Sequence, residues 1–122
     1  MATRYIVNDV DVAIEFYTGL LGFSLKQQAG AAFAIVQRDD LALMLTGPAA
    51  SASQPMPDGS QPTPGGWNRI LLEVEDIAAT VAAMRSAGTT FRNDIVSGKF
   101  GQTILAEDPS GNAVELVQRP SG

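Results

Sequence analysis

The residue best placed to do chemistry is a carboxylate, Glu115, in the stretch EDPSGNAVELVQ at 107–118. Its neighbours Val114, Leu116 and Val117 are apolar, and a charged side chain in such a strand is expected to be partly buried and to have a partner. That partner is a metal ion, an arginine or lysine, or backbone donors. The chain contains no His and no Cys, so metal sites built on imidazole or thiolate are not available.

Other catalytic arrangements are also missing from the sequence. Without His or Cys, no Ser–His or Cys–His nucleophile can form. The glycines of PGG (64–66) and SGKFG (97–101) do not follow the pattern of a phosphate-binding loop. We therefore predict no catalytic residue and no cofactor. An enzyme that uses none of these arrangements is still compatible with the sequence.

The composition fits one globular domain. The chain has 122 residues, of which 45% are hydrophobic, which is enough to build a core. No apolar run is long enough to span a membrane, and the start MATRYIVNDV lacks the features of a signal peptide. The lack of cysteine fits a cytoplasmic protein. A net charge of −5 with scattered basic residues argues against a nucleic-acid surface.

Two parts of the chain repeat one pattern. The stretches IVNDVDVAI (6–14) and EVEDIAATV (73–81) align at an offset of 67, which places Asp9 on Asp76. In both, a strand end is followed by an aspartate and then by apolar residues at helical spacing. A repeat of about half the chain indicates two copies of one supersecondary unit.

Each copy is predicted to be βαβββ. Helical spacing runs over 10–21 and 77–84, and Gly22 and Gly88 follow as stop signals. Asp9 or Asp11 is the expected N-cap of the first helix, and Asp76 that of the second. Runs typical of strands are 23–28, 32–38, 41–46, 90–96, 101–107 and 113–118, with hairpin turns at 38–41 and 108–112. The predicted fold class is α+β.

Residues 47–66, GPAASASQPMPDGSQPTPGG, have the composition of a loop or linker. A loop of this length in a small domain is either a lid over a binding site or a solvated connector. The expected organisation is a single domain, 1–122, with module one at about 2–46, the loop at 47–66 and module two at about 67–119.

Three stretches together resemble the vicinal oxygen chelate superfamily, which includes glyoxalases, extradiol dioxygenases and bleomycin-resistance proteins. They are VNDVDVAIEFYTGLLGFSL (7–25), GGWNRILLEVEDIAATVAAMRSAG (65–88) and EDPSGNAVELVQ (107–118), in the order the family has them. The resemblance implies two βαβββ modules that form a cupped mixed sheet. It does not fix one function, because the superfamily hosts several chemistries and some metal-free binding proteins.

In metal-dependent members, four side chains from the first and last strands of the modules hold one divalent metal. Carried over by position, they fall on Ala2, Met44, Arg69 and Glu115. Alanine cannot ligate, a thioether is a poor ligand for hard ions, and a guanidinium repels them. The resemblance therefore implies that the metal site is lost, as in the antibiotic-binding branch, and that Arg69 pairs with Glu115 in its place. Such a pair either orients a ligand or only neutralises a remnant of the metal site.

Strand alternation predicts the rest of the lining. Residues two apart share a face, so Trp67 joins Arg69, although a lone Trp is also a common core or interface residue. A two-residue turn at 39–40 places Ile35 across from Met44. The predicted ligand-binding residues are Trp67, Arg69, Glu115, Met44, Phe33 and Ile35, with Gln102 and Ile104 expected across the second hairpin from Glu115.

Two classes of function fit this lining. An apolar cup with one aromatic plate favours a hydrophobic or planar ligand, so we predict a metal-free protein that sequesters an antibiotic-like small molecule, as in drug resistance. The alternative is an enzyme of the same superfamily: a metal-free isomerase, cyclase or hydrolase of natural-product metabolism, or a divergent metal-dependent lyase or dioxygenase. The expected partners are the small molecule and a second copy of the chain, because an open sheet edge and apolar wall need a cover. Neither nucleic acid nor a membrane is expected.

Overall fold

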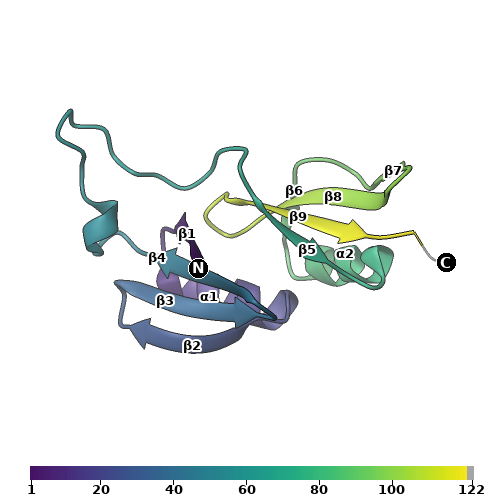
Figure 1. Ribbon diagram of the computed structural model, residues 1–122, viewed down its shortest axis with the longest axis horizontal. Coiled ribbons are helices and arrows are strands. Elements are labelled where there is room, and N and C mark those ends of the chain that lie inside the picture. The colour runs from purple at the N-terminus through teal and green to yellow at the C-terminus, as the bar shows by residue number, and fades with distance from the viewer. Residues whose placement is uncertain (121–122) are drawn as a thin grey trace. The chain divides into compact units, whose positions relative to one another are not determined.

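The computed structural model describes residues 1–120 (Figure 1). The chain divides into two compact units, residues 1–65 and residues 66 onward, each with its own sheet and helix. No helix within the described residues combines the length and the apolar character needed to cross a membrane. The two units are described in turn.

The first unit has the predicted βαβββ order. Its elements are β1 (Ala2–Ile6), α1 (Val10–Leu20), β2 (Ser24–Ala29), β3 (Phe33–Arg38), β4 (Leu41–Thr46) and a short 3-10 helix, η1 (Ser51–Ser53). The sheet order is β1-β4-β3-β2, with β1 parallel to β4 and the other pairs antiparallel (Figure 1). Arg38 pairs with Leu41, which confirms the two-residue turn at 39–40.

Helix α1 covers one face of this sheet. The Asp9 carboxylate accepts a hydrogen bond from Val12 N at 3.1 Å and so caps the helix. Tyr17, which is fully buried, packs edge-on against Phe16 and Phe23 at ring-centre distances of 5.0 and 5.4 Å. The strand residues on the helix side are also fully buried: Ala34, Val36, Leu43 and Leu45.

The opposite face of the sheet, which we call the open face of the first unit, is less covered. Phe33, Ile35 and Met44 lie on it and are half-buried. Ile35 is paired with Met44, as strand alternation predicts. At the sheet edge, every residue of β2 is exposed, and a bulge interrupts its pairing between Leu25 and Gln27.

Residues 47–65 leave β4 as a long loop that is partly held by its own side chains (Figure 1). The Ser53 hydroxyl, which is buried, donates to the Gly47 carbonyl at 2.7 Å. A Cβ on Gly47 would lie 2.5 Å from the Ala31 carbonyl oxygen, so only glycine fits where the loop leaves the sheet. The composition therefore predicted the loop, but not its local order.

The second unit repeats the first. Its elements are β5 (Ile70–Glu73), α2 (Ile77–Ser86), β6 (Thr90–Phe91), β7 (Val96–Gly98), β8 (Gly101–Glu107) and β9 (Ala113–Gln118). The sheet order is β5-β9-β8-β6, β7 also pairs with β8, and β5 is parallel to β9. Asp76 caps α2 by accepting from Ala79 N at 3.0 Å. The α+β class with mixed sheets is thereby confirmed.

The strand predicted at 90–96 is wrong as a continuous element. It divides into β6 and β7, and the residues between them do not continue the ladder. The Asn93 side-chain oxygen accepts from Leu105 N at 2.9 Å, and Arg92 N donates to the Leu105 carbonyl at 2.8 Å. A side-chain acceptor thus replaces the backbone acceptor that a continuous strand would offer.

The predicted placement of Gln102 and Ile104 across the second hairpin from Glu115 is wrong, although the turn has the predicted bounds. Glu107 pairs with Ala113, so the turn spans 108–112 and Leu105 lies opposite Glu115. Gln102 and Ile104 consequently lie on the helix side of the sheet, with Ile104 only 1% exposed. A shift of one residue moves a side chain to the other face.

Hydrogen bonds within the turn set its length. The Asp108 Oδ1 accepts from both Ser110 N and Asn112 N at 2.9 Å. The turn therefore has the bounds expected from the sequence, and with these bounds Leu105, rather than Gln102 or Ile104, lies opposite Glu115.

Candidate functional site

On the second unit, the open face is the sheet face away from α2, and it carries the predicted ion pair. Arg69 Nε and Nη2 both lie 2.9 Å from Glu115 Oε1. Arg69 Nη1 donates to the Trp67 carbonyl at 3.1 Å. The Glu115 side chain is 18% exposed and that of Arg69 is 37% exposed, so the pair borders solvent. The partner of the carboxylate is therefore the arginine.

This arrangement does not fit the divalent metal of the family. Ala2 and Met44 supply no oxygen or nitrogen side-chain ligand, and the Glu115 carboxylate already accepts from a guanidinium. Within residues 1–120, no three acidic, His or Cys side chains gather into a group that could hold a metal ion. One carboxylate neutralised by Arg69 is a poor basis for a metal centre.

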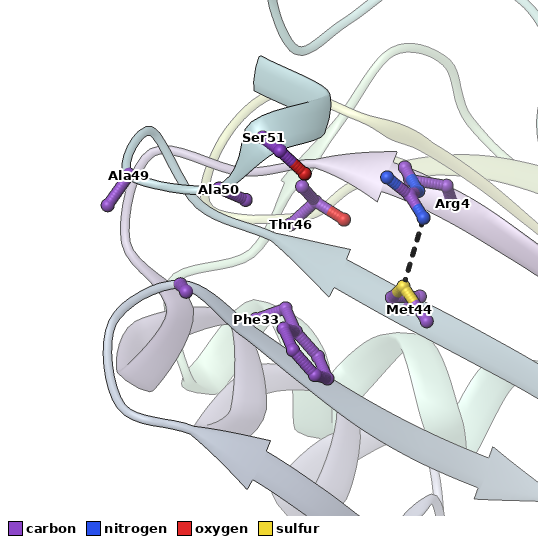
Figure 2. A pocket seen from close by; sticks show the side chains of 8 residues that line it. Arg4, Phe33, Met44, Thr46, Ala49, Ala50 and Ser51 are labelled. Atoms are coloured by element: carbon purple, nitrogen blue, oxygen red, sulfur yellow. Dashed lines mark hydrogen bonds between the residues drawn. The ribbon is translucent and has the colours of Figure 1, made fainter. Parts of the chain in front are cut away.

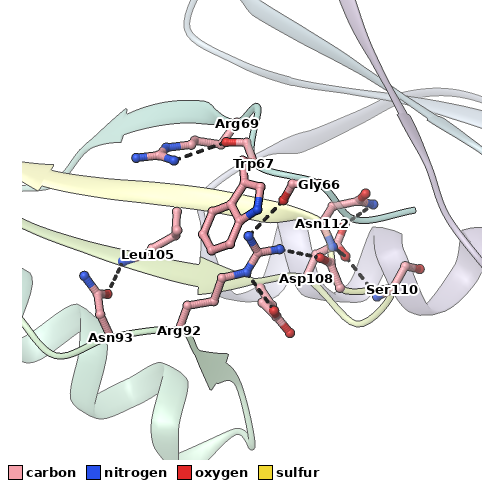
Figure 3. Close-up of polar contacts among 11 residues, drawn as sticks. Gly66, Trp67, Arg69, Arg92, Asn93, Leu105, Asp108, Ser110 and Asn112 are labelled. Carbon is pink, nitrogen blue, oxygen red and sulfur yellow. Dashed lines mark hydrogen bonds and ion pairs between the residues drawn. The ribbon is translucent and has the colours of Figure 1, made fainter. Parts of the chain in front are cut away.

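Trp67 precedes β5, and its ring packs over an arginine. The Arg92 guanidinium carbon lies 4.7 Å from the centre of the indole, and Trp67 remains 70% exposed (Figure 3). This is a cation–π arrangement on one face of the ring. The indole is thus supported from one side while most of its surface is accessible.

Arg92 is itself held at three points (Figure 3). Its Nε donates to Glu107 Oε2 at 2.8 Å, Nη1 to the Gly66 carbonyl at 2.8 Å and Nη2 to the Gly111 carbonyl at 3.0 Å. The bond to Gly66 fixes the backbone just before Trp67. Arg92 therefore joins the start of the second unit to the β8–β9 turn and orients the indole.

A surface cavity of about 330 Å³ lies beside Glu115 on the second unit. Three large apolar residues in its lining are strongly exposed: Leu71 at 54%, Val96 at 54% and Phe100 at 82%. The remaining lining residues are Gly98, Lys99, Gly101, Thr103, Glu115, Val117 and Arg119. Trp67 and Arg69 are not part of this lining.

The first unit has a cavity of about 410 Å³ on its open face (Figure 2). Arg4, from β1, lies beside Met44 of β4, and its Nη2 is 3.3 Å from the Met44 sulfur. The lining residues are Arg4, Ala32, Phe33, Met44, Thr46, Ala49, Ala50 and Ser51. Met44 and Phe33, both predicted from the sequence, therefore meet in this cavity with residues of the loop.

Sequence reasoning missed two arginines. Arg92 lies in the stretch mistaken for a continuous strand. Arg4 lies two residues after Ala2, the position carried over from the family, and shares its face of β1. Alternation along β1 therefore contained the signal for Arg4, whereas nothing in the spacing pointed to Arg92.

Comparison with known proteins identifies the family. Residues 2–116 match the Glyoxalase/Bleomycin resistance protein/Dioxygenase superfamily. The chain belongs to this superfamily, as the sequence resemblance indicated.

Its relatives include enzymes and a binding protein. It is 27% identical to a probable lactoylglutathione lyase from Synechocystis sp., over 98% of this chain and 94% of that protein. A lactoylglutathione lyase from Agrobacterium tumefaciens has a similar structure, with a TM-score of 0.72 and 18% identity over 97% of this chain and 91% of that one. TnmS3, an antibiotic binding protein from Streptomyces sp. CB03234, has a TM-score of 0.68 and 23% identity over 98% and 96%. The two structural similarities, at these identities, establish the fold alone.

Proposed function

We propose that this chain is a metal-free small-molecule binding protein that holds a hydrophobic or planar, antibiotic-like ligand and releases it unchanged. On the second unit, Trp67 would stack on a planar ligand and Arg69 with Glu115 would orient a polar group of it. On the first unit, Met44, Phe33 and Ile35 offer an apolar surface to a ligand.

The observation that carries this proposal is the Arg69–Glu115 pair. Where metal-dependent members place ligands, this chain has an arginine bonded to the one remaining carboxylate. A guanidinium provides directed donors for a carbonyl or acidic group, and it does not provide Lewis acidity. The structural similarity to TnmS3, an antibiotic binding protein, supports a binding function for this chain.

The proposal extends to a homodimer in the cytoplasm. Support for self-association comes from the exposed apolar residues Leu71, Val96 and Phe100, which gather around one cavity of the second unit. Sedimentation velocity on the purified chain measures the mass directly, and a monomer at micromolar concentration would contradict this part of the proposal.

The experiment that tests the function uses Trp67, which is the only tryptophan in the chain. Planar antibiotics are titrated while Trp67 emission is recorded, the ligand is recovered and analysed by liquid chromatography, and the protein is analysed for metal. We expect saturable quenching, unchanged ligand and no stoichiometric metal. Conversion of the ligand to a new compound would contradict the proposal.

A second candidate is an enzyme. The observation in its favour is the 27% identity to a probable lactoylglutathione lyase over nearly the whole of both chains. The test is formation of lactoylglutathione with and without added divalent metal ions. Metal-dependent turnover that is abolished by Glu115→Gln would favour this candidate over sequestration.

A further inference from the structure

The cavity on the open face of the first unit contains a cation that has no acidic partner. The four ion pairs found among residues 1–120 do not include Arg4. Its one hydrogen bond to another described residue is to the Met44 sulfur at 3.3 Å, and a thioether is a weak acceptor. Most of the five N–H donors of this guanidinium are therefore available to a ligand.

A buried hydroxyl lines the same cavity. Thr46 is 1% exposed, and its Oγ1 has no hydrogen-bond partner among the described residues. Thr46 lies two residues after Met44 on β4, so the two side chains share the open face, and Figure 2 shows Thr46 beneath η1. Buried hydroxyls normally have a partner, so one that lines a cavity without a partner offers a hydrogen bond to a ligand atom.

The rest of the lining is apolar or small. Phe33 is paired with Thr46 across β3 and β4 and provides an aromatic wall. Ala32, Ala49 and Ala50 leave room around it, and no acidic side chain lines the cavity. The positive charge of Arg4 and the hydroxyl of Thr46, without a negative charge nearby, favour a ligand with an anionic oxygen group. The apolar lining favours a ligand whose remaining surface is apolar. A volume of about 410 Å³ suits a ligand of drug size.

We propose that this cavity is a recognition site for the carboxylate of a planar, apolar ligand, with Arg4 and Thr46 as its hydrogen-bond donors. The inference rests on the proposed binding function and specifies the chemical class of the ligand. It also assigns the acid group to Arg4 rather than to Arg69, whose guanidinium is already engaged by Glu115.

The test compares two probes of the same shape, pyrene-1-carboxylate and the neutral pyrene-1-carboxamide, by fluorescence anisotropy with the full-length chain. The variants are Arg4→Gln and Thr46→Val. The control is Lys26→Gln, which removes the same charge from an exposed position on β2. Chemical shifts of the labelled Met44 methyl group, assigned with Met44→Leu, report where the acid binds because Met44 touches Arg4.

We expect the wild-type chain to bind the acid about tenfold more tightly than the amide, since a charge-assisted hydrogen bond contributes at least that factor. Arg4→Gln should remove this preference, Thr46→Val should reduce it, and Lys26→Gln should preserve it. The Met44 methyl signal should shift with the acid.

Three results would overturn the inference. Equal binding of acid and amide would do so while leaving the binding function standing. A preference that survives Arg4→Gln but disappears in Arg69→Gln would assign the acid to the second unit. If neither probe binds, the carboxylate site is rejected, and the Trp67 titration decides the proposed function separately.

Discussion

Arg69 and Glu115 form an ion pair in which two nitrogens of the arginine, Nε and Nη2, lie 2.9 Å from the same carboxylate oxygen. Because Arg69 is 37% exposed, its removal should lower the free energy of unfolding by only about 1 kcal/mol or less. Arg69→Ala should nevertheless weaken binding of a ligand with a carbonyl group, by about tenfold for one lost charged hydrogen bond. Urea unfolding and ligand titration measure the two effects. Unchanged affinity for every ligand found would exclude Arg69 from the binding surface.

Thr46→Val should stabilise the free protein. The hydroxyl of Thr46 is buried without a partner, and leaving such a group unsatisfied costs about 1–3 kcal/mol. Valine has the same shape, so we expect the free energy of unfolding to rise by about 1 kcal/mol. Thr18→Val is the matched control, because the Thr18 hydroxyl donates to the Ile14 carbonyl at 2.7 Å. The control should destabilise the protein, and the same sign for both variants would contradict the prediction.

Arg92→Ala should destabilise the second unit and release Trp67. Arg92 is 17% exposed and bonds Glu107 and two carbonyls, so its loss should cost roughly 2 kcal/mol. Trp67 emission should change in intensity or wavelength, because the cation over its ring is lost.

The control for Arg92 is Arg85→Ala. Arg85 is 54% exposed, and its contact with Asp94 is 3.8 Å long, so its removal should cost less than about 0.5 kcal/mol. If thermal unfolding moves equally in both variants, the three-point anchoring of Arg92 is not what holds the unit.

Gly101 is required at the start of β8. It has a φ of +120°, and a Cβ there would lie 2.1 Å from the Gln118 carbonyl oxygen. Gly101→Ala should therefore lower the free energy of unfolding by about 1–3 kcal/mol through backbone strain. The clash of the new Cβ with the Gln118 carbonyl should lower it further. Its pairing partner Gly98 has open space around it, so Gly98→Ala should be close to neutral. Thermal unfolding compares the two, and equal melting temperatures would refute the prediction.

A turn in the 47–65 loop should respond to acid. The Ser60 hydroxyl and the Ser60 backbone N–H both donate to Asp58, and they lower the pKa of that carboxyl below its ordinary value. Because the pKa of Asp58 is lower in the folded state than in the unfolded state, its hydrogen bonds stabilise the turn at pH values above the unfolded-state pKa. This stabilisation is lost as the pH falls through the folded-state pKa. The Ser60 amide signal should titrate at a lower pH than in an unstructured peptide of the same sequence. Asp58→Asn should abolish the titration.

The sequence was sufficient for the repeat and for the Arg69–Glu115 pair. Aspartate caps and helical spacing are local signals, and the meeting of Arg69 with Glu115 followed from the positions that the family resemblance gave. The pairing of Ile35 with Met44 followed from a turn whose length the sequence showed. These features depend on residues that are close along the chain or matched by the repeat.

The remaining errors have different causes. The turn at 108–112 is the expected one, but counting from it places Leu105, not Ile104, opposite Glu115. Asn93 breaks the strand predicted at 90–96 by accepting from Leu105 N. Hydrogen bonds from Asp and Asn side chains compete with the backbone ladder, and hydrophobic spacing does not record them.

Each sheet pairs its first strand with its last, and this has a consequence for folding order. Arg4 meets Met44 across β1 and β4, which are separated by a helix and two strands. The β3–β4 hairpin can form early, whereas β1 must wait for β4 before it gains a partner. During synthesis, the first unit therefore has all its strands once residue 46 has left the ribosome. Its strands can therefore all pair before β5 has been synthesised.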